Sequence, residues 1–120
     1  MVRPTIEIGI DCRDPERLAP FWAAALGYEV GDLDAAGVYL DLVPPEPSLP
    51  VVYLQKVPEG KATKNRLHLD LYAADAVTLV ERLCALGAVR LGGPQTGSAG
   101  GSWQVMADPD GNEFCVCQAG

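Results

Sequence analysis

The sequence lacks the features that mark membrane, secreted and nucleic-acid-binding proteins. No apolar run approaches the roughly 20 residues of a membrane-spanning helix. The first residues lead straight into a strand pattern, without the apolar core of a signal peptide. Only 9 residues are basic against 16 acidic ones, and the net charge of −7 repels phosphate backbones and anionic lipids. We therefore expect a cytoplasmic protein that binds neither nucleic acid nor membranes.

Cysteine and histidine are also scarce. The 4 cysteines include no Cys-x-x-Cys pair, which argues against a structural zinc site. Cys115 and Cys117 alternate along one predicted strand, so they share a face and do not easily close a disulfide. Cys12 and Cys84 are interpreted as small buried residues. His68 is the single histidine, and it is the side chain best suited to transfer a proton near neutral pH.

An internal repeat organises the 120 residues, which suffice for one domain with its own core. Alternating apolar residues predict strands over 5–11 and 66–72, with isoleucines or leucines on one face and polar residues on the other. An amphipathic helix follows each strand; it begins after Asp14 or Asp75 and ends at Gly27 or Gly87, which are 60 residues apart. Three short strands follow each helix, over 28–30, 38–43 and 51–57 in the first copy and over 88–91, 103–107 and 113–118 in the second.

Four connections are distinctive. Residues 108–111, Asp-Pro-Asp-Gly, predict a type I turn that joins the last two strands as a hairpin. The proline-rich stretch 44–50 cannot be the interior of a strand. Residues 92–102 are rich in glycine and serine and are expected to form a mobile loop, and residues 58–65 are expected to be an exposed linker.

Three stretches, in this order, resemble the vicinal-oxygen-chelate superfamily, and in particular its glyoxalase-like and bleomycin-resistance-like domains. They are residues 11–28 with Phe21-Trp22 and Leu26-Gly27-Tyr28, residues 64–71, and residues 108–114. The resemblance implies an α+β fold in a single domain of residues 1–120. Two βαβββ modules, 1–60 and 64–120, would form curved mixed sheets around a shared cup-like cavity. It also implies a homodimer.

The resemblance also indicates where a divalent Zn, Ni, Mn or Fe ion would bind. In metal-using members the ligands come from the first and last strands of each module. The matching positions here are Glu7 and His68 in the first strands and either Tyr53 or Gln55 in the first module's last strand. Cys115 stands where the second module usually has a carboxylate. The chain therefore departs from the metal-binding pattern, and an ion, if present, is expected on Glu7, Gln55 and His68.

Two main functions follow from the resemblance. The first is a binder of a small organic molecule in the central cavity, without a full metal site. The alternative is a metal-dependent lyase, isomerase or dioxygenase acting on a small oxygenated substrate, with His68 and Glu7 as a proton-transfer pair. A third interpretation, a structural module with a filled cup, also stays open. The residues expected to touch a ligand are Tyr53, Gln55, Asp70, Tyr72, Trp103, Glu113 and Cys115. For the three aromatic residues the alternative is core packing, and for Cys115 it is an inert thiol.

Overall fold

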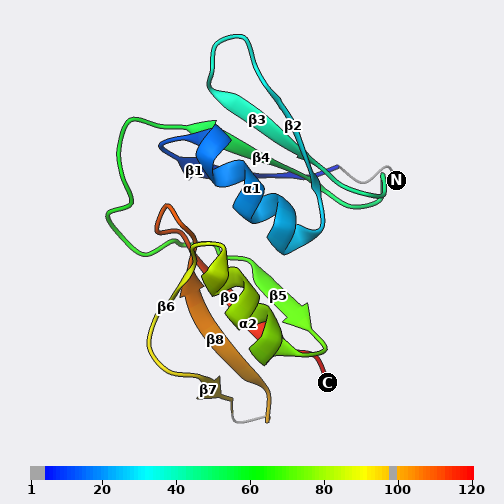
Figure 1. The fold of residues 1–120 in the computed structure, drawn as a ribbon, viewed down its shortest axis with the longest axis vertical. Coiled ribbons are helices and arrows are strands. Elements are labelled where there is room, and N and C mark those ends of the chain that lie inside the picture. The colour runs from blue at the N-terminus through cyan, green and yellow to red at the C-terminus, as the bar shows by residue number, and fades with distance from the viewer. Residues whose placement is uncertain (1–4, 98–99) are drawn as a thin grey trace. The chain divides into compact units, whose positions relative to one another are not determined.

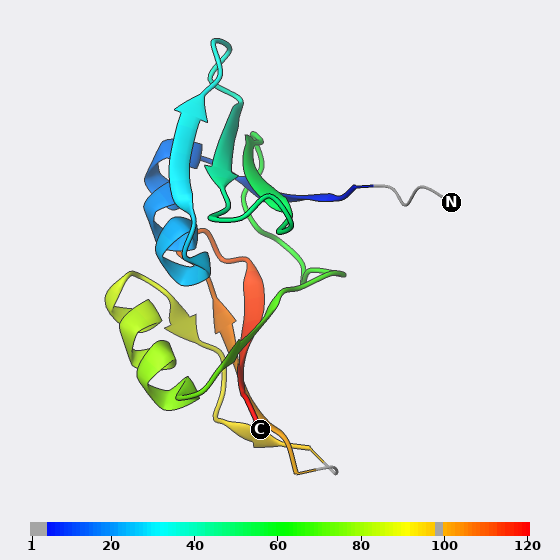
Figure 2. The ribbon, with the colours of Figure 1, turned by 90° about the vertical axis from the view of Figure 1, so that its right-hand side faces the viewer.

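The computed structural model describes residues 5–97 and 100–120, which form two helices and nine strands. The chain divides into two compact units, Met1–Gly60 and Lys61–Gly120. In each of them a helix lies along one side of a sheet (Figures 1 and 2). Neither helix has the length or the apolar character to cross a bilayer. The shared cavity between the two modules stays a prediction.

The first unit is a four-stranded sheet under one helix. Its elements are β1 (Glu7–Cys12), α1 (Pro15–Leu26), β2 (Glu29–Leu33), β3 (Tyr39–Val43) and β4 (Val51–Lys56). The strands lie in the order β1-β4-β3-β2, with β1 parallel to β4. The helix begins as expected, because the Asp14 carboxylate accepts a hydrogen bond from the backbone N–H of Arg17 at 3.3 Å. It ends at Gly27, whose φ of +70° is left-handed.

Aromatic and aliphatic side chains fill the space between α1 and its sheet. Phe21 and Trp22 are both buried, and their rings meet edge to face with centroids 5.3 Å apart. Below them the sheet presents Leu40, Leu42 and Leu54, which are also buried. Trp22 is therefore a core residue of the first unit.

The second unit repeats the plan with shorter strands. Its elements are β5 (Asp70–Ala73), α2 (Ala76–Ala85), β6 (Val89–Arg90), β7 (Gln95–Thr96), β8 (Ser102–Ala107) and β9 (Glu113–Gln118). The order is β5-β9-β8-β6, with β7 also paired to β8. As in the first unit, the first strand runs parallel to the last. Asp75 caps α2, and the β8–β9 hairpin closes through Gly111, whose N–H donates to the carbonyl of Asp108 at 2.9 Å.

Several expectations about the elements were wrong. The strand expected over 66–72 begins only at Asp70, because the chain bends at Arg66 and Leu67. Leu67 is 90% exposed and not on a buried face, and Ile6, placed in the first strand, lies before β1 and is 65% exposed. The expected loop 92–102 contains the short strand β7. Ser98 and Ala99, which also fall in this expected loop, lie outside the described residues.

The expected linker is also more tightly held than its composition indicated. Lys61 and Asn65 are half-buried, and both bind Glu113 of β9. Lys61 and Asn65 thus attach this stretch to the second unit, while residues 58–60 and 62–64 are exposed as expected.

Candidate functional site

The two sides of the second sheet differ in chemistry. Phe114 and Val116 of β9 are buried on the helix side. Cys115 and Cys117 alternate with them and face the other way. The pairing register places Asp70 beside Cys115, and Tyr72 and Trp103 beside Cys117. This side, opposite α2, is here called the open face of the second unit.

The open face brings together three metal-binding or proton-transferring side chains, His68, Asp70 and Cys115. The Nε2 atom of His68 lies 3.1 Å from Oδ1 of Asp70. The two side chains are 41% and 44% exposed, so the pair is open to a ligand. One donor atom from each of the three residues lies within 4.8 Å of the others. Sequence reasoning singled out all three, but it did not identify Asp70 as the group that would join His68 and Cys115.

Both thiols of the open face are held in the protonated form. Burial raises the pKa of Cys115, and the neighbouring Asp70 carboxylate and Cys117 raise it further. Burial and Asp70 raise the pKa of Cys117 in the same direction. A protonated thiol is a weak nucleophile. The structure therefore favours inert packing over a reactive thiol at Cys115, in the absence of a metal.

Glu113, expected to touch a ligand, is engaged within its own unit. Lys61 Nζ lies 2.8 Å from its Oε1 atom, and the backbone N–H of Asn65 donates to the same oxygen at 3.0 Å. Burial raises the pKa of Glu113. The hydrogen bonds from Lys61 and Asn65 and the charge of Lys61 lower it by more, so the pKa lies below its ordinary value. We therefore assign Glu113 the role of fastening residues 61–65 to β9.

The first unit has an open face of its own, and it is built differently. Glu7, Gly9 and Asp11 of β1 pair with Val51, Tyr53 and Gln55 of β4, so these side chains share one side of the sheet. A Cβ atom on Gly9 would lie 2.6 Å from the Tyr53 hydroxyl oxygen, so the phenol ring lies directly over β1 at this glycine. Tyr39 meets the same ring edge to face at a centroid distance of 6.0 Å. An aromatic pair therefore covers part of this face.

The register decides which first-unit residue corresponds to Cys115. Gly9 and Asp70 hold equivalent positions in the first strands of the two units. Gly9 pairs with Tyr53, and Asp70 pairs with Cys115. The counterpart of Cys115 is therefore Tyr53 and not Gln55. Gln55 pairs with Asp11, four residues beyond Glu7 on the same strand. Glu7 and Gln55 are thus about 13 Å apart along the sheet.

This separation bears on the metal that the resemblance implies. Glu7 and Gln55 are therefore poorly placed to share one ion. His68, Asp70 and Cys115 fit a divalent ion better, because they offer one nitrogen, one oxygen and one sulfur donor, all of which zinc accepts. Cys115 would have to lose its proton on binding, so the affinity of this set would rise with pH.

The comparisons with known proteins agree with this architecture. The family model for the glyoxalase-like domain matches residues 7–117. No curated protein matches the sequence. A glyoxalase/bleomycin resistance protein/dioxygenase superfamily member from Sphaerobacter thermophilus is 22% identical, with a TM-score of 0.72 and 98% of each chain covered.

Two further solved structures carry names from antibiotic resistance. The fosfomycin resistance protein FosX from Mesorhizobium loti is 16% identical, with a TM-score of 0.72 over 100% of this chain and 95% of its own. A bleomycin resistance determinant encoded on the transposon Tn5 is 17% identical, with a TM-score of 0.66 over 97% of this chain and 98% of its own. At these identities the likeness concerns the fold, while the match of the family model covers nearly the whole chain. The chain belongs to the glyoxalase-like domain family, within the vicinal-oxygen-chelate superfamily that its repeated motifs resemble.

Proposed function

We propose that the protein binds a small, planar, oxygenated organic molecule on the open face of the second unit and does not convert it. The observation that carries this proposal is the exposed His68–Asp70 pair, whose nitrogen and oxygen lie 3.1 Å apart beside a protonated thiol. This combination offers hydrogen bonds without an activated nucleophile. Two structural relatives carry the names of a fosfomycin and a bleomycin resistance protein, which supports a drug-like molecule as the ligand.

The chemistry of the pair determines how it would bind a ligand. Nε2 of His68 lies against the Asp70 carboxylate, and the exposed imidazole presents its other ring nitrogen, Nδ1, to a ligand hydroxyl. Tyr72 is 71% exposed on the same face and offers a flat surface for stacking. Trp103 lies beside Cys117 and is half-buried, so it extends the aromatic border. Polar recognition beside aromatic surface favours a planar ligand with oxygen substituents.

Calorimetric titration of the metal-stripped protein tests this proposal. The probes are bleomycin, fosfomycin and a set of small phenolic carboxylates. We expect one of them to bind at one molecule per chain and to be recovered unchanged. His68→Ala should weaken that binding about tenfold, because one hydrogen bond to the ligand is lost. Leu67→Ala, at the exposed neighbouring position, should leave it unchanged. Absence of binding tighter than about 1 mM for every probe would refute the proposal.

A second candidate function is a zinc-dependent reaction on an oxygenated substrate, and the grouping of His68, Asp70 and Cys115 favours it. A bound zinc ion would supply Lewis-acid polarisation of a substrate oxygen. The three side chains would hold the ion, and Glu7 stays a predicted proton-transfer partner of His68. Zinc titration followed by metal analysis tests this candidate. We expect one ion per chain, bound more tightly as the pH rises, and lost in Cys115→Ser but not in Cys84→Ser.

We also propose that the chain forms a homodimer, as the family resemblance implies. Light scattering should then give a mass about twice the 12.7 kDa of one chain. A mass equal to that of a single chain across the accessible concentration range would contradict the dimer.

A further inference from the structure

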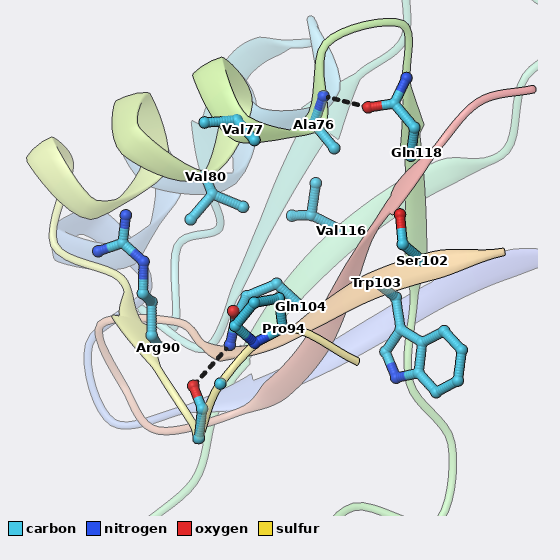
Figure 3. Close-up of a pocket in the computed structure, with 12 residues that line it drawn as sticks. Ala76, Val77, Val80, Arg90, Pro94, Ser102, Trp103, Gln104, Val116 and Gln118 are labelled. Carbon is cyan, nitrogen blue, oxygen red and sulfur yellow. Dashed lines mark hydrogen bonds between the residues drawn. The ribbon is translucent and has the colours of Figure 1, made fainter. Parts of the chain in front are cut away.

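A cavity lies on the other side of the second sheet, between α2 and the strands. Its volume is about 340 Å³, within the range of small-molecule sites. Val80 and Val116 are among its apolar lining residues, and both are buried. Figure 3 shows their side chains facing one another across the space, with Val77 beside them. Val116 alternates with Cys115 along β9, so it faces away from the open face, while Trp103, which borders the open face, also contributes to the lining of the cavity.

The two helices differ in the large side chains that they bury. In the repeat, Trp22 of α1 corresponds to Leu83 of α2 when the helix caps Asp14 and Asp75 are aligned. The bulky aromatic pair that fills the first interior therefore has no equivalent in the second. Leu83 is itself buried and does not line the cavity, whose lining includes the exposed Val77, so the cavity is a groove open to solvent beside a packed core.

Two strand positions change in the same direction, from apolar to polar. Leu40 of β3 pairs with Leu54, and Gln104 of β8 pairs with the equivalent residue Val116. Leu40 therefore corresponds to Gln104. Gln104 is buried, and its Nε2 atom donates to the carbonyl of Gly92 at 3.0 Å, as Figure 3 shows. Leu42 of the first sheet and Met106 of the second are equivalent. Leu42 pairs with Val30 of β2 and Met106 pairs with Arg90 of β6, so Val30 corresponds to Arg90. The second copy thus adds a cation and an amide to the helix side of its sheet.

Arg90 lines the cavity and has no ion-pair partner among residues 5–97 and 100–120. A guanidinium prefers planar two-oxygen groups such as carboxylates, which it binds through two parallel hydrogen bonds. The remaining walls are mostly apolar and suit a hydrocarbon body. The chemistry of the cavity is therefore that of an amphipathic site with one cationic end.

We infer that the cavity between α2 and the second sheet is a second binding site, specific for a small amphipathic carboxylate such as a medium-chain fatty acid. The carboxylate pairs with Arg90, and the alkyl chain lies against Val77, Val80 and Val116. The site lies on the helix side of the sheet, opposite the open face, and Trp103 borders both.

Titration of the ¹⁵N-labelled full chain with octanoate, followed by two-dimensional NMR, tests this inference. We expect saturable shifts of the amides of residues 76–80, 90–93 and 102–104, with those of β5 unaffected. Octanol, which has the same chain length and no charge, should bind about tenfold more weakly, because it cannot form the charge-assisted pair with Arg90.

Two variants and a control make the assignment specific. Arg90→Gln should weaken octanoate binding about tenfold and leave octanol binding unchanged. Val77→Asp places a negative charge in the lining at an exposed first-turn helix position, so it should weaken octanoate without harming the fold. Arg82→Gln is the control: it makes the same arginine-to-glutamine change on α2, outside the cavity, and should have no effect. Equal binding of octanoate by the parent chain and Arg90→Gln, or the absence of saturable shifts in the parent, would overturn the inference.

Discussion

At the scale of single residues, the Cys115 thiol shows how a neighbouring carboxylate suppresses reactivity. Burial and the charge of Asp70 both raise its pKa, so little thiolate is present near neutral pH. Asp70→Asn removes the charge and should speed alkylation of Cys115 by iodoacetamide several-fold at pH 8, because the pKa of the thiol falls. Mass mapping after timed labelling measures this rate. Glu81→Gln, on the exposed side of α2, should not change it; a slower reaction in Asp70→Asn would contradict the role assigned to Asp70.

The contact between Lys61 and Glu113 is the second residue-scale case, and it makes stability depend on pH. The pKa of Glu113 is lower in the folded state than in the unfolded state. The carboxylate therefore stabilises the fold at pH values above its unfolded-state pKa. This stability is lost as the pH falls through the folded-state pKa. Lys61→Met should lower the free energy of unfolding by roughly 1–2 kcal/mol at pH 7. The difference should shrink as the pH falls below the ordinary glutamate value of 4.5. Urea denaturation at a series of pH values measures it, with Lys64→Met as the charge-matched control; a pH-independent difference would argue against this contact.

At the scale of elements, the β8–β9 hairpin depends on one buried carboxylate. Asp108 accepts hydrogen bonds from the backbone N–H groups of Asp110 and Asn112, at 2.8 and 2.9 Å. Asp108→Ala leaves these donors without their partner and should cost roughly 2–4 kcal/mol of stability. Asp110→Ala, in the same turn, should cost far less. Thermal unfolding of the two variants distinguishes them, and equal losses would show that the turn does not rest on the Asp108 side chain.

The elements themselves were largely predictable because their signals are local. Asp14 and Gly27 mark the ends of α1, and the expected range of the last strand matches β9. The errors have non-local causes. Alternation predicted a strand from residue 66, but Asn65 is tied to Glu113, 48 positions away, and the chain bends just after it. Strand β7 has only two residues and exists because it pairs with β8. Such contacts are set by the tertiary fold, and no local pattern reports them.

The candidate site was only partly predictable for the same reason. The residue types and the period-two alternation are enough to place His68, Asp70 and Tyr72 on one face. The parallel register of β5 against β9, which brings Cys115 to Asp70, joins residues 45 positions apart. The cavity behind α2 was not predicted at all. A comparison of the two repeat copies, residue by residue, would have shown the changes from Trp22 to Leu83 and from Leu40 to Gln104.

At the scale of the whole molecule, the net charge of −7 opposes compaction. Raising the salt concentration from about 0.01 to about 0.15 M shortens the screening length from about 30 to about 8 Å and weakens this repulsion. We expect the melting temperature at pH 7 to rise by roughly 2–5 °C over that range. Scanning calorimetry measures it. The rise should vanish near the isoelectric point of about 4.5, and a fall at pH 7 would mean that attractive pairs dominate.

The packed interior under α1 and the open groove beside α2 also differ in how well they accommodate new side chains. Where Trp22 and Phe21 already occupy all the room, almost any new side chain either clashes or leaves a void. Under α2 the spare volume admits larger groups at little steric cost. We therefore expect substitutions to cost less stability at the lining of the groove beside α2 than in the interior under α1. New ligand preferences can arise in one half of the molecule while the other half preserves the architecture.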